Sequence, residues 1–332
     1  MWQWIRSLPN EWQAEIEAPP ITIPTPPSQV YTGIVTLGMG GSAFGAEVVR
    51  AWARSLLSIP WEIIRDYSLP AWVSSRTLVI STSYSGTTEE TLSATQEALK
   101  RGATVVGIAS GGTLRAWGEE GRLVAFIPLP SGRPPRAAVH FSIAAQFRLL
   151  EGLGLIPYTW REEAQALLPL LFSPNHPDTA TLRALSQAWA QHIIVLYAPP
   201  EYECIALRAR QQIQENAKHL AWHHTIPEMN HNEIVGWEYP SPLQEKVAFW
   251  LLEGSHIHPR NRSRLDFMEA LLKERGLQYA RWCAPQAPYL AQLLWFLHAV
   301  DLFSIYLAEA HGVDPTPVPI IDKLKSHLAQ QA

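Results

Sequence analysis

The sequence predicts an α/β fold with two doubly wound subdomains, each a parallel sheet flanked by helices, followed by a C-terminal helical tail. The first observation is that short apolar runs such as Ile34-Val35-Thr36-Leu37 and Leu78-Val79-Ile80 alternate with helical stretches. The second is that this alternation occurs twice along the 332 residues, so the halves resemble one duplicated unit. Strands that alternate with helices of this length imply right-handed crossovers and a parallel sheet covered on both faces.

The first half contains strand and helix signals in regular alternation. Ahead of them, residues 2–16 read as an amphipathic helix interrupted near Pro9, and residues 17–29 as a proline-rich connector without regular structure. The predicted strands are 34–37, 61–64, 77–81, 104–108 and 123–127, and the predicted helices are 43–55, 89–101 and 137–151.

The second half follows the same plan more loosely and ends in a proline-punctuated tail with a short basic helix. The predicted strands are 192–197, 247–252 and 278–282, and the predicted helices are 161–171, 179–191, 201–218, 266–274 and 288–312. We therefore expect an N-terminal helix and connector, a first subdomain, a second subdomain and a C-terminal tail, at 1–29, 30–155, 156–312 and 313–332.

Composition excludes several classes of protein. A net charge of -4 gives no electrostatic footprint for nucleic acid. Two cysteines, Cys204 and Cys283, argue against a disulfide framework and for a reducing compartment. No signal peptide is visible, and no run reaches the roughly 18 apolar residues of a membrane span. We expect a cytoplasmic protein that binds neither nucleic acid nor membrane.

A hydroxyl-rich loop, residues 81–88, follows the strand 77–81 and precedes a helix whose N-cap is predicted at Thr88. Such a junction directs backbone N–H groups and the helix dipole at one point. Ser83, Ser85, Thr87 and Thr88 add short donors, and the loop holds no lysine or arginine. The pattern favours a neutral cage for a phosphomonoester, although a solvated turn gives the same signal.

The loop after strand 34–37 has two functional interpretations. Gly38, Gly40 and Ala43 match a dinucleotide fingerprint superficially. That fingerprint also requires an acidic residue about 20 residues further along the chain, and Asp66 matches this position poorly. Alternatively, Gly40 and Gly41 let the backbone approach a bound sugar while Ser42 donates a hydrogen bond. A tight strand-to-helix turn without a ligand would need the same residues.

Histidines occur in two polar stretches of the second half. His219, His223 and His224 suggest a metal site if 219 and 223 lie one helical turn apart, but no third ligand has a zinc-like spacing, so a solvated face is expected. His231 lies between two asparagines in a non-periodic stretch, where polar density is typical of a functional loop.

Several motifs in order along the chain identify a family resemblance. The stretches Gly40-Gly41-Ser42 and 83–91 look like the sugar isomerase (SIS) domain. With Pro135-Arg136-Ala137, Glu215-Asn216, residues 230–233 and the tail residues 314–325, the chain resembles the bifunctional phosphoglucose/phosphomannose isomerases of archaea and bacteria from about residue 30 to 326. Thr87 departs from the family, in which asparagine is common at that place.

The resemblance implies an aldose–ketose isomerase that interconverts glucose 6-phosphate and mannose 6-phosphate with fructose 6-phosphate through an enediolate, a step of carbohydrate metabolism. Glu215 would be the base, Arg136 would stabilise the enediolate, and His231 and Lys323 would act in ring opening.

By the same resemblance, Ser83, Ser85 and Thr88 would hold the phosphate. Gly41 and Ser42 would contact the substrate, and Thr316 would accept the mannose epimer. No metal or organic cofactor is expected. A homodimer with a shared active site is implied, because in the family the histidine comes from the neighbouring subunit.

Two other functions remain open. A non-catalytic sugar-phosphate-binding regulator would keep the hydroxyl loop but would not need Glu215, His231 and Lys323 together. A dinucleotide-dependent oxidoreductase would use the Gly38 loop but would leave the hydroxyl loop and the tail unexplained.

Overall fold

The computed structural model describes residues 1–24, 30–172, 179–239 and 241–330. The chain divides into two compact units. One, here called the first unit, comprises Arg6–Leu168 and Pro288–Ala291, and the other, the second unit, comprises Met1–Ile5, Pro169–Ala287 and Gln292–Ala332. The predicted domain boundaries stay a prediction, and each unit is described by itself.

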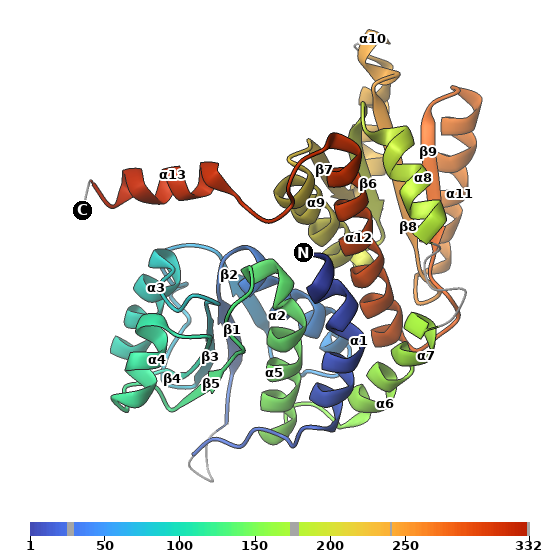
Figure 1. Ribbon diagram of the computed structural model, residues 1–332. Helices are drawn as coiled ribbons and strands as arrows, with labels where there is room; N and C mark the ends of the chain where they lie inside the picture. The colour runs from blue at the N-terminus through green and yellow to red at the C-terminus, as the bar shows by residue number, and fades with distance from the viewer. Residues whose placement is uncertain (25–29, 173–178, 240, 331–332) are drawn as a thin grey trace. The chain divides into compact units, whose positions relative to one another are not determined.

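The first unit is built on a five-stranded sheet in the order β2-β1-β3-β4-β5, with all neighbouring strands parallel (Figure 1). Every residue of β1 and of β3 is buried, which is typical of central strands covered on both faces. The strands are β1 (Gly33–Leu37), β2 (Trp61–Ile64), β3 (Thr77–Thr82), β4 (Thr104–Ala109) and β5 (Ala125–Pro128). The helices are α1 (Trp2–Glu17), α2 (Gly40–Ala53), α3 (Glu89–Lys100), α4 (Gly112–Glu119), η1 (Pro135–Ala137), α5 (Val139–Gly152), α6 (Thr159–Gln165) and α7 (Leu167–Phe172), with the ends of α1 and α7 in the second unit.

The second unit repeats this plan with a four-stranded parallel sheet in the order β7-β6-β8-β9. Its strands are β6 (Ile193–Ala198), β7 (Ala221–Thr225), β8 (Val247–Glu253) and β9 (Gln278–Cys283). Its helical elements are α8 (Thr179–Trp189), η2 (Pro200–Tyr202), α9 (Glu203–Ala217), η3 (Glu228–His231), η4 (Glu233–Glu238), α10 (Ser241–Gln244), α11 (Pro259–Glu274), α12 (Tyr289–His311) and α13 (Pro319–Leu328).

The strand order fixes where each sheet can receive a ligand. In both sheets the first strand of the unit lies between its second and third strands. The order in which strands are added to the sheet therefore reverses between β1 and β3 in one sheet and between β6 and β8 in the other. Open parallel sheets bind ligands in the crevice outside the carboxyl ends of the strands at such a switch point. The predicted fold class is confirmed, and it gives two equivalent crevices.

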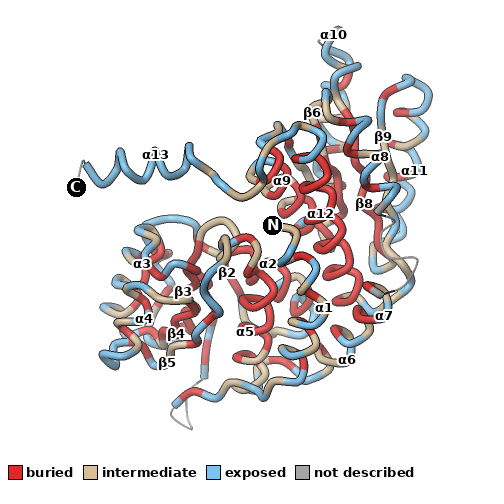
Figure 2. The backbone as a smooth tube through the Cα atoms, viewed as in Figure 1, coloured by how far each residue is buried: buried red, intermediate tan, exposed pale blue. Residues whose placement is uncertain are grey.

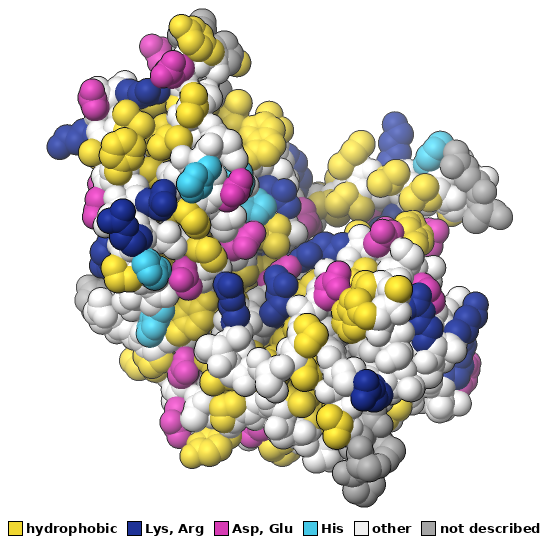
Figure 3. Space-filling view, turned by 180° about the vertical axis from the view of Figure 1, so that it is seen from behind, with side chains coloured by type: hydrophobic (Ala, Val, Ile, Leu, Met, Phe, Trp, Pro, Cys, Tyr) yellow, Lys and Arg dark blue, Asp and Glu magenta, His cyan; other side chains and the backbone are white. Residues whose placement is uncertain are grey.

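Each unit has its own apolar core, seen as the buried strands and helices in Figure 2. Within the described residues, α12 is the helix long and apolar enough to cross a membrane, but the whole of that apolar window is buried, as in a core helix. On the face drawn in Figure 3, acidic and basic side chains are interspersed.

Several element predictions are wrong in detail. The N-terminal helix is not interrupted at Pro9, because the buried side chains of Leu8, Trp12 and Ile16 hold it. Strand β7 was not predicted, since its sequence Ala-Trp-His-His-Thr has no apolar run. Helix α11 begins at Pro259 rather than residue 266, and the predicted helix 161–171 is two helices, α6 and α7.

Candidate active site

Three segments of the first unit meet beside the carboxyl ends of β1 and β3. The Ser42 hydroxyl, just inside α2, accepts a hydrogen bond from the backbone N–H of Tyr84 at 3.0 Å. At Gly41, a Cβ atom would lie 3.3 Å from the Cα of Arg136, so glycine lets η1 pack closely on the start of α2. The predicted residues Gly41, Ser42 and Arg136 are thus brought together with the hydroxyl loop.

Ser83 organises the hydroxyl loop from inside. It is fully buried, and its Oγ accepts from the N–H groups of Gly86 at 3.1 Å and Thr88 at 3.4 Å and lies 2.8 Å from Thr88 Oγ1. Thr88 is the N-cap of α3, as predicted, but its side chain makes no capping hydrogen bond because it is engaged by Ser83.

The outer part of the loop faces solvent. Ser85 and Thr87 are exposed, and the Thr87 hydroxyl donates to Ser85 Oγ at 3.0 Å. These hydroxyls, together with the N–H groups that begin α3, are donors suited to phosphate oxygens. The arrangement can hold a phosphate without a cationic side chain in the loop.

Backbone packing fixes the shape of the loop. Gly86 has φ +73°, and a Cβ there would lie 1.8 Å from the carbonyl oxygen of Gly111. The Tyr84 hydroxyl donates to the carbonyl of Pro130 at 2.9 Å and accepts from the N–H of Arg133 at 3.3 Å. The hydroxyl loop is therefore tied to the segment that leads into Arg136.

Helix α1, for which the sequence suggested no role, also contacts the segment that leads from Arg133 to Arg136. The Glu11 carboxylate receives two hydrogen bonds of 3.1 Å from Arg133 and lies 2.7 Å from His140 Nε2. Burial raises the pKa of Glu11, but hydrogen bonds from His140 and Arg133 outweigh it and bring the pKa to about 2. Arg136, three residues after Arg133, is 4% exposed.

In the second unit, the predicted base Glu215 lies in the last turn of α9 and is half-buried. The next residue, Asn216, is fully buried and donates to Ser304 Oγ of α12 at 2.9 Å, which fixes this end of α9. Lys218 donates from Nζ to the carbonyl of Asp314 at 3.1 Å, and Asp314 in turn accepts from the N–H of Thr316 at 2.8 Å. Glu215 and the predicted residue Thr316 therefore belong to one connected set of contacts.

His231 ends η3 and is exposed. The loop that carries it is fixed by Glu233, which accepts from the Tyr197 hydroxyl and contacts His224 Nδ1, both at 2.5 Å. Burial and the Glu233 carboxylate raise the pKa of Tyr197, so it stays a hydrogen-bond donor. Tyr197 was not singled out from the sequence, and His224 was considered only as part of a possible metal site, because neither stands in a pattern that predicts a contact with Glu233.

A pocket of about 320 Å³ opens next to this loop and was also missed. The Oδ1 atom of Asn230 is buried and lacks a hydrogen-bond partner among the described residues. The lining residues are Asn230, Ile234, Arg260, Ser263, Arg264 and Phe267.

Lys323 lies on α13, a helix without a buried residue, and is exposed. Apolar side chains on the same helix are also exposed, among them Ile320 at 73% and Leu324 at 55%. The structure leaves this helix unpacked, so it does not assign Lys323 a partner in the site.

The histidine cluster does not form a helical face. His223 and His224 are neighbours on strand β7, whereas His219 precedes it and pairs with His311 at 2.9 Å. All three are partly buried rather than solvated, and burial lowers the pKa of His223 to about 4. Among the described residues, no three histidines, cysteines or acids lie close enough to hold a metal ion.

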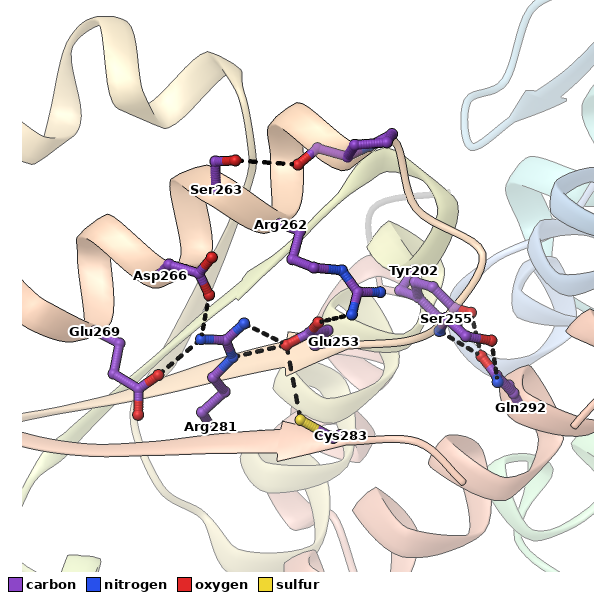
Figure 4. A network of polar contacts seen from close by, with 11 residues as sticks. Tyr202, Glu253, Ser255, Arg262, Ser263, Asp266, Glu269, Arg281, Cys283 and Gln292 are labelled. Atoms are coloured by element: carbon purple, nitrogen blue, oxygen red, sulfur yellow. Dashed lines mark hydrogen bonds and ion pairs between the residues drawn. The ribbon is translucent and has the colours of Figure 1, made fainter. Parts of the chain in front are cut away.

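At the equivalent place in the second unit, beyond the end of β8, side chains form a network of polar contacts with one another (Figure 4). A Cβ at Gly254 would lie 2.0 Å from the Tyr202 hydroxyl, and that hydroxyl donates to Gln292 Oε1 at 2.5 Å. Beside it, the Glu253 carboxylate contacts Arg281 at 2.6 Å and Arg262 at 3.1 Å.

The chain is similar to known proteins over most of its length. The family model described as the bacterial phospho-glucose isomerase C-terminal SIS domain matches residues 181–328. The bifunctional phosphoglucose/phosphomannose isomerase of Caldicellulosiruptor bescii is 37% identical over 304 residues, covering 90% of this chain and 89% of that protein. The protein of the same name from Aquifex aeolicus is 32% identical, covering 91% and 92%.

Solved structures share the fold at low identity. A hypothetical protein from Thermus thermophilus has a TM-score of 0.74 at 17% identity, covering 99% of this chain and 89% of that one. The C-terminal domain of glucosamine-fructose-6-phosphate aminotransferase from Francisella tularensis has a TM-score of 0.71 at 14% identity, covering 96% and 97%. Identity over nearly the full length of its curated relatives shows that this chain belongs to the family of bifunctional phosphoglucose/phosphomannose isomerases.

Proposed function

We propose that the protein interconverts glucose 6-phosphate and mannose 6-phosphate with fructose 6-phosphate by proton transfer through an enediolate. The observation that carries the proposal is the hydroxyl loop at the β1–β3 switch point, tied by hydrogen bonds and close packing to Gly41, Ser42 and Arg136, in a chain of this family. The step belongs to carbohydrate metabolism, in glycolysis or gluconeogenesis, and we place the protein in the cytoplasm.

The phosphate would bind the hydroxyl loop. Ser85 and Thr88 offer hydroxyl donors, and Ser83 holds the loop in the shape that presents its N–H groups. Ser42 and Gly41 would face the sugar. A neutral set of donors at a helix N-terminus suits a phosphomonoester.

The chemistry would be divided between Glu215 and Arg136. A carboxylate moves the proton between C1 and C2, and a fixed guanidinium stabilises the negative charge that develops on the enediolate. Arg136 is almost completely buried, which favours a fixed orientation and strengthens its electrostatic effect.

The remaining residues would open the ring and admit the epimer. His231 and Lys323 would transfer protons at the ring oxygen and its hydroxyl, and Thr316 would leave room for the intermediate to present either face. No step in this scheme uses a metal or an organic cofactor.

The first test is an assay that starts from fructose 6-phosphate, with a chelator present, and measures glucose 6-phosphate and mannose 6-phosphate separately. Formation of both supports the proposal, including the role of Thr316. Glucose 6-phosphate alone would contradict the dual specificity, and binding without turnover would move the protein to the sugar-phosphate-binding regulators.

Glu215→Gln tests the proposed base. The change keeps the shape of the side chain and removes the proton acceptor, so turnover should be abolished while sugar-phosphate binding is retained. Loss of binding instead of turnover would contradict the assignment.

A homodimer with shared active sites is the second part of the proposal, supported by the exposure of His231 and of the apolar side chains of α13. Mixing inactive Glu215→Gln and His231→Ala subunits tests it. If His231 serves the partner's site, each mixed dimer regains one site with both residues intact. If His231 serves its own subunit, the mixture stays inactive.

A further inference from the structure

Lys218 ends α9 in a backbone conformation that favours glycine. It has φ 54° and ψ 36°, and it is the only non-glycine residue with positive φ among those described. Helices commonly place glycine at such a left-handed end, because a Cβ there is sterically unfavourable. The side chain of Lys218 makes hydrogen bonds that glycine could not make.

The Lys218 ammonium joins two segments that are far apart in the sequence. Its Nζ donates to the carbonyl oxygen of Glu215 at 2.8 Å and to that of Asn216 at 3.4 Å, at the negative end of the α9 dipole. It also donates to the carbonyl of Asp314 at 3.1 Å. The first two contacts are an ordinary helix cap, whereas the third links the cap to the C-terminal tail.

The link continues into the tail. The Asp314 carboxylate accepts from the N–H of Thr316 at 2.8 Å, and this hydrogen bond, with the charge of Lys218 contributing, lowers the pKa of Asp314. The neighbouring residue His219 makes a second tie, because its Nδ1 lies 2.9 Å from Nε2 of His311 at the end of α12. Two consecutive residues after α9 therefore contact the end of α12 and the start of the tail.

We infer that Lys218 is a positioning residue that holds the tail segment Asp314–Thr316 against the end of α9 carrying Glu215. It does not touch the substrate; it sets the distance between the carboxylate of the base and the tail. This inference rests on the proposed function of Glu215 and Thr316, and it predicts that losing the ammonium lowers turnover and changes the product ratio without weakening substrate binding.

Two variants separate positioning from stability. Lys218→Met keeps the aliphatic stem and the unfavourable backbone but removes all three hydrogen bonds. Lys218→Gly removes the same bonds but relieves the backbone, so its Tm should remain near that of the native protein. Lys273→Met is the matched control, since Lys273 is an exposed lysine in the last turn of α11.

Both Lys218 variants should lose about tenfold or more in kcat, because small displacements of catalytic groups are costly. The KM for fructose 6-phosphate should change little, and the ratio of glucose 6-phosphate to mannose 6-phosphate should shift. Lys273→Met should match the native protein. Native kcat and product ratio in Lys218→Gly, or a raised KM at constant kcat, would overturn the inference.

Hydrogen exchange of the tail amides gives a readout that does not depend on activity. Both Lys218 variants should exchange the Thr316 amide about tenfold faster than the native protein. Unchanged exchange would overturn the link itself. An inactive native protein with faster exchange in the variants would sink the proposed function but leave Lys218 holding the tail.

Discussion

Near the carboxyl ends of β1 and β3, small and hydroxyl residues pack together, whereas at the end of β8 the ring of Tyr202 packs against Gly254. Both sheets have the same strand order at this point, so the topology alone offers a ligand crevice twice. The side chains decide which one remains available. Under the proposed function, the sugar phosphate would bind only at the hydroxyl loop of the first unit.

The two crevices also differ in how their polar groups are satisfied. In the second, Glu253 is 6% exposed and held by arginines, and Gln292 accepts from both Tyr202 and the N–H of Ser255 at 3.0 Å. In the first, Ser85 and Thr87 remain exposed to solvent. Satisfied polar groups stabilise a fold, while exposed donors can bind a ligand.

The largest expected loss of stability comes from adding a methyl group to the hydroxyl loop. Gly86→Ala meets a backbone carbonyl at 1.8 Å with φ +73°, so the loop must move, and we expect a loss of about 3 kcal/mol in the free energy of unfolding. Its KM for fructose 6-phosphate should rise sharply. Chemical denaturation and steady-state kinetics measure the two effects.

Gly254→Ala is the matched change in the second crevice. The new methyl group meets the Tyr202 hydroxyl at 2.0 Å, and we expect a loss of about 2 kcal/mol, because a side chain can shift further than backbone. The KM of the folded protein should stay unchanged. A raised KM here would show that the second crevice also binds substrate and would break the comparison.

Ser83→Ala should come next. It leaves the half-buried N–H of Thr88 without its acceptor, whereas the N–H of Gly86 keeps the backbone carbonyl of Ser83 at 2.9 Å, so we expect a loss of about 1.5 kcal/mol. The KM should rise, since the loop loses the group that shapes it. Thermal unfolding and kinetics test this, and a stability loss at constant KM would mean that the loop shape does not depend on Ser83.

Tyr202→Phe has a smaller expected effect. The change removes the buried hydrogen bond to Gln292, whose Oε1 keeps the Ser255 N–H, and the hydrogen bond with the backbone of His256, so about 1 kcal/mol of stability should be lost. Both kcat and KM should remain at native values. A change in either kinetic constant would assign the second crevice a role in the reaction.

The smallest loss of stability is expected for Glu11→Gln, which weakens the contact between α1 and Arg133 in the first unit. Because the pKa of Glu11 is about 2 in the folded protein against 4.5 for an ordinary glutamate, its contribution to stability is complete above pH 4.5 and disappears as the pH falls toward 2. After solvent screening we expect about 1 kcal/mol at neutral pH. Denaturation of both proteins across this pH range should show the difference vanishing in acid, and a constant difference would contradict it.

The sequence by itself determined the fold class, because strand and helix periodicities are local and their alternation implies parallel sheets. It also located the hydroxyl loop and the Thr88 cap position, which depend on neighbouring residues. The prediction missed β7, whose tryptophan and histidines form a strand only by pairing with β6. It also interrupted α1 at Pro9, where the burial of apolar side chains of the helix outweighs the low helix propensity of proline.

Only the tertiary structure decided which side chains pack at each switch point, which residues hold the hydroxyl loop, and what α1 contacts. Tyr202 fills the second crevice through contacts with Gly254 and Gln292, and Glu11 reaches Arg133 across more than a hundred residues. Such contacts join residues whose spacing carries no periodic signal, because they depend on where crossovers and helix ends bring side chains together in space. The same physics applies to Lys218, whose ammonium contacts the carbonyl of Asp314 across 96 residues.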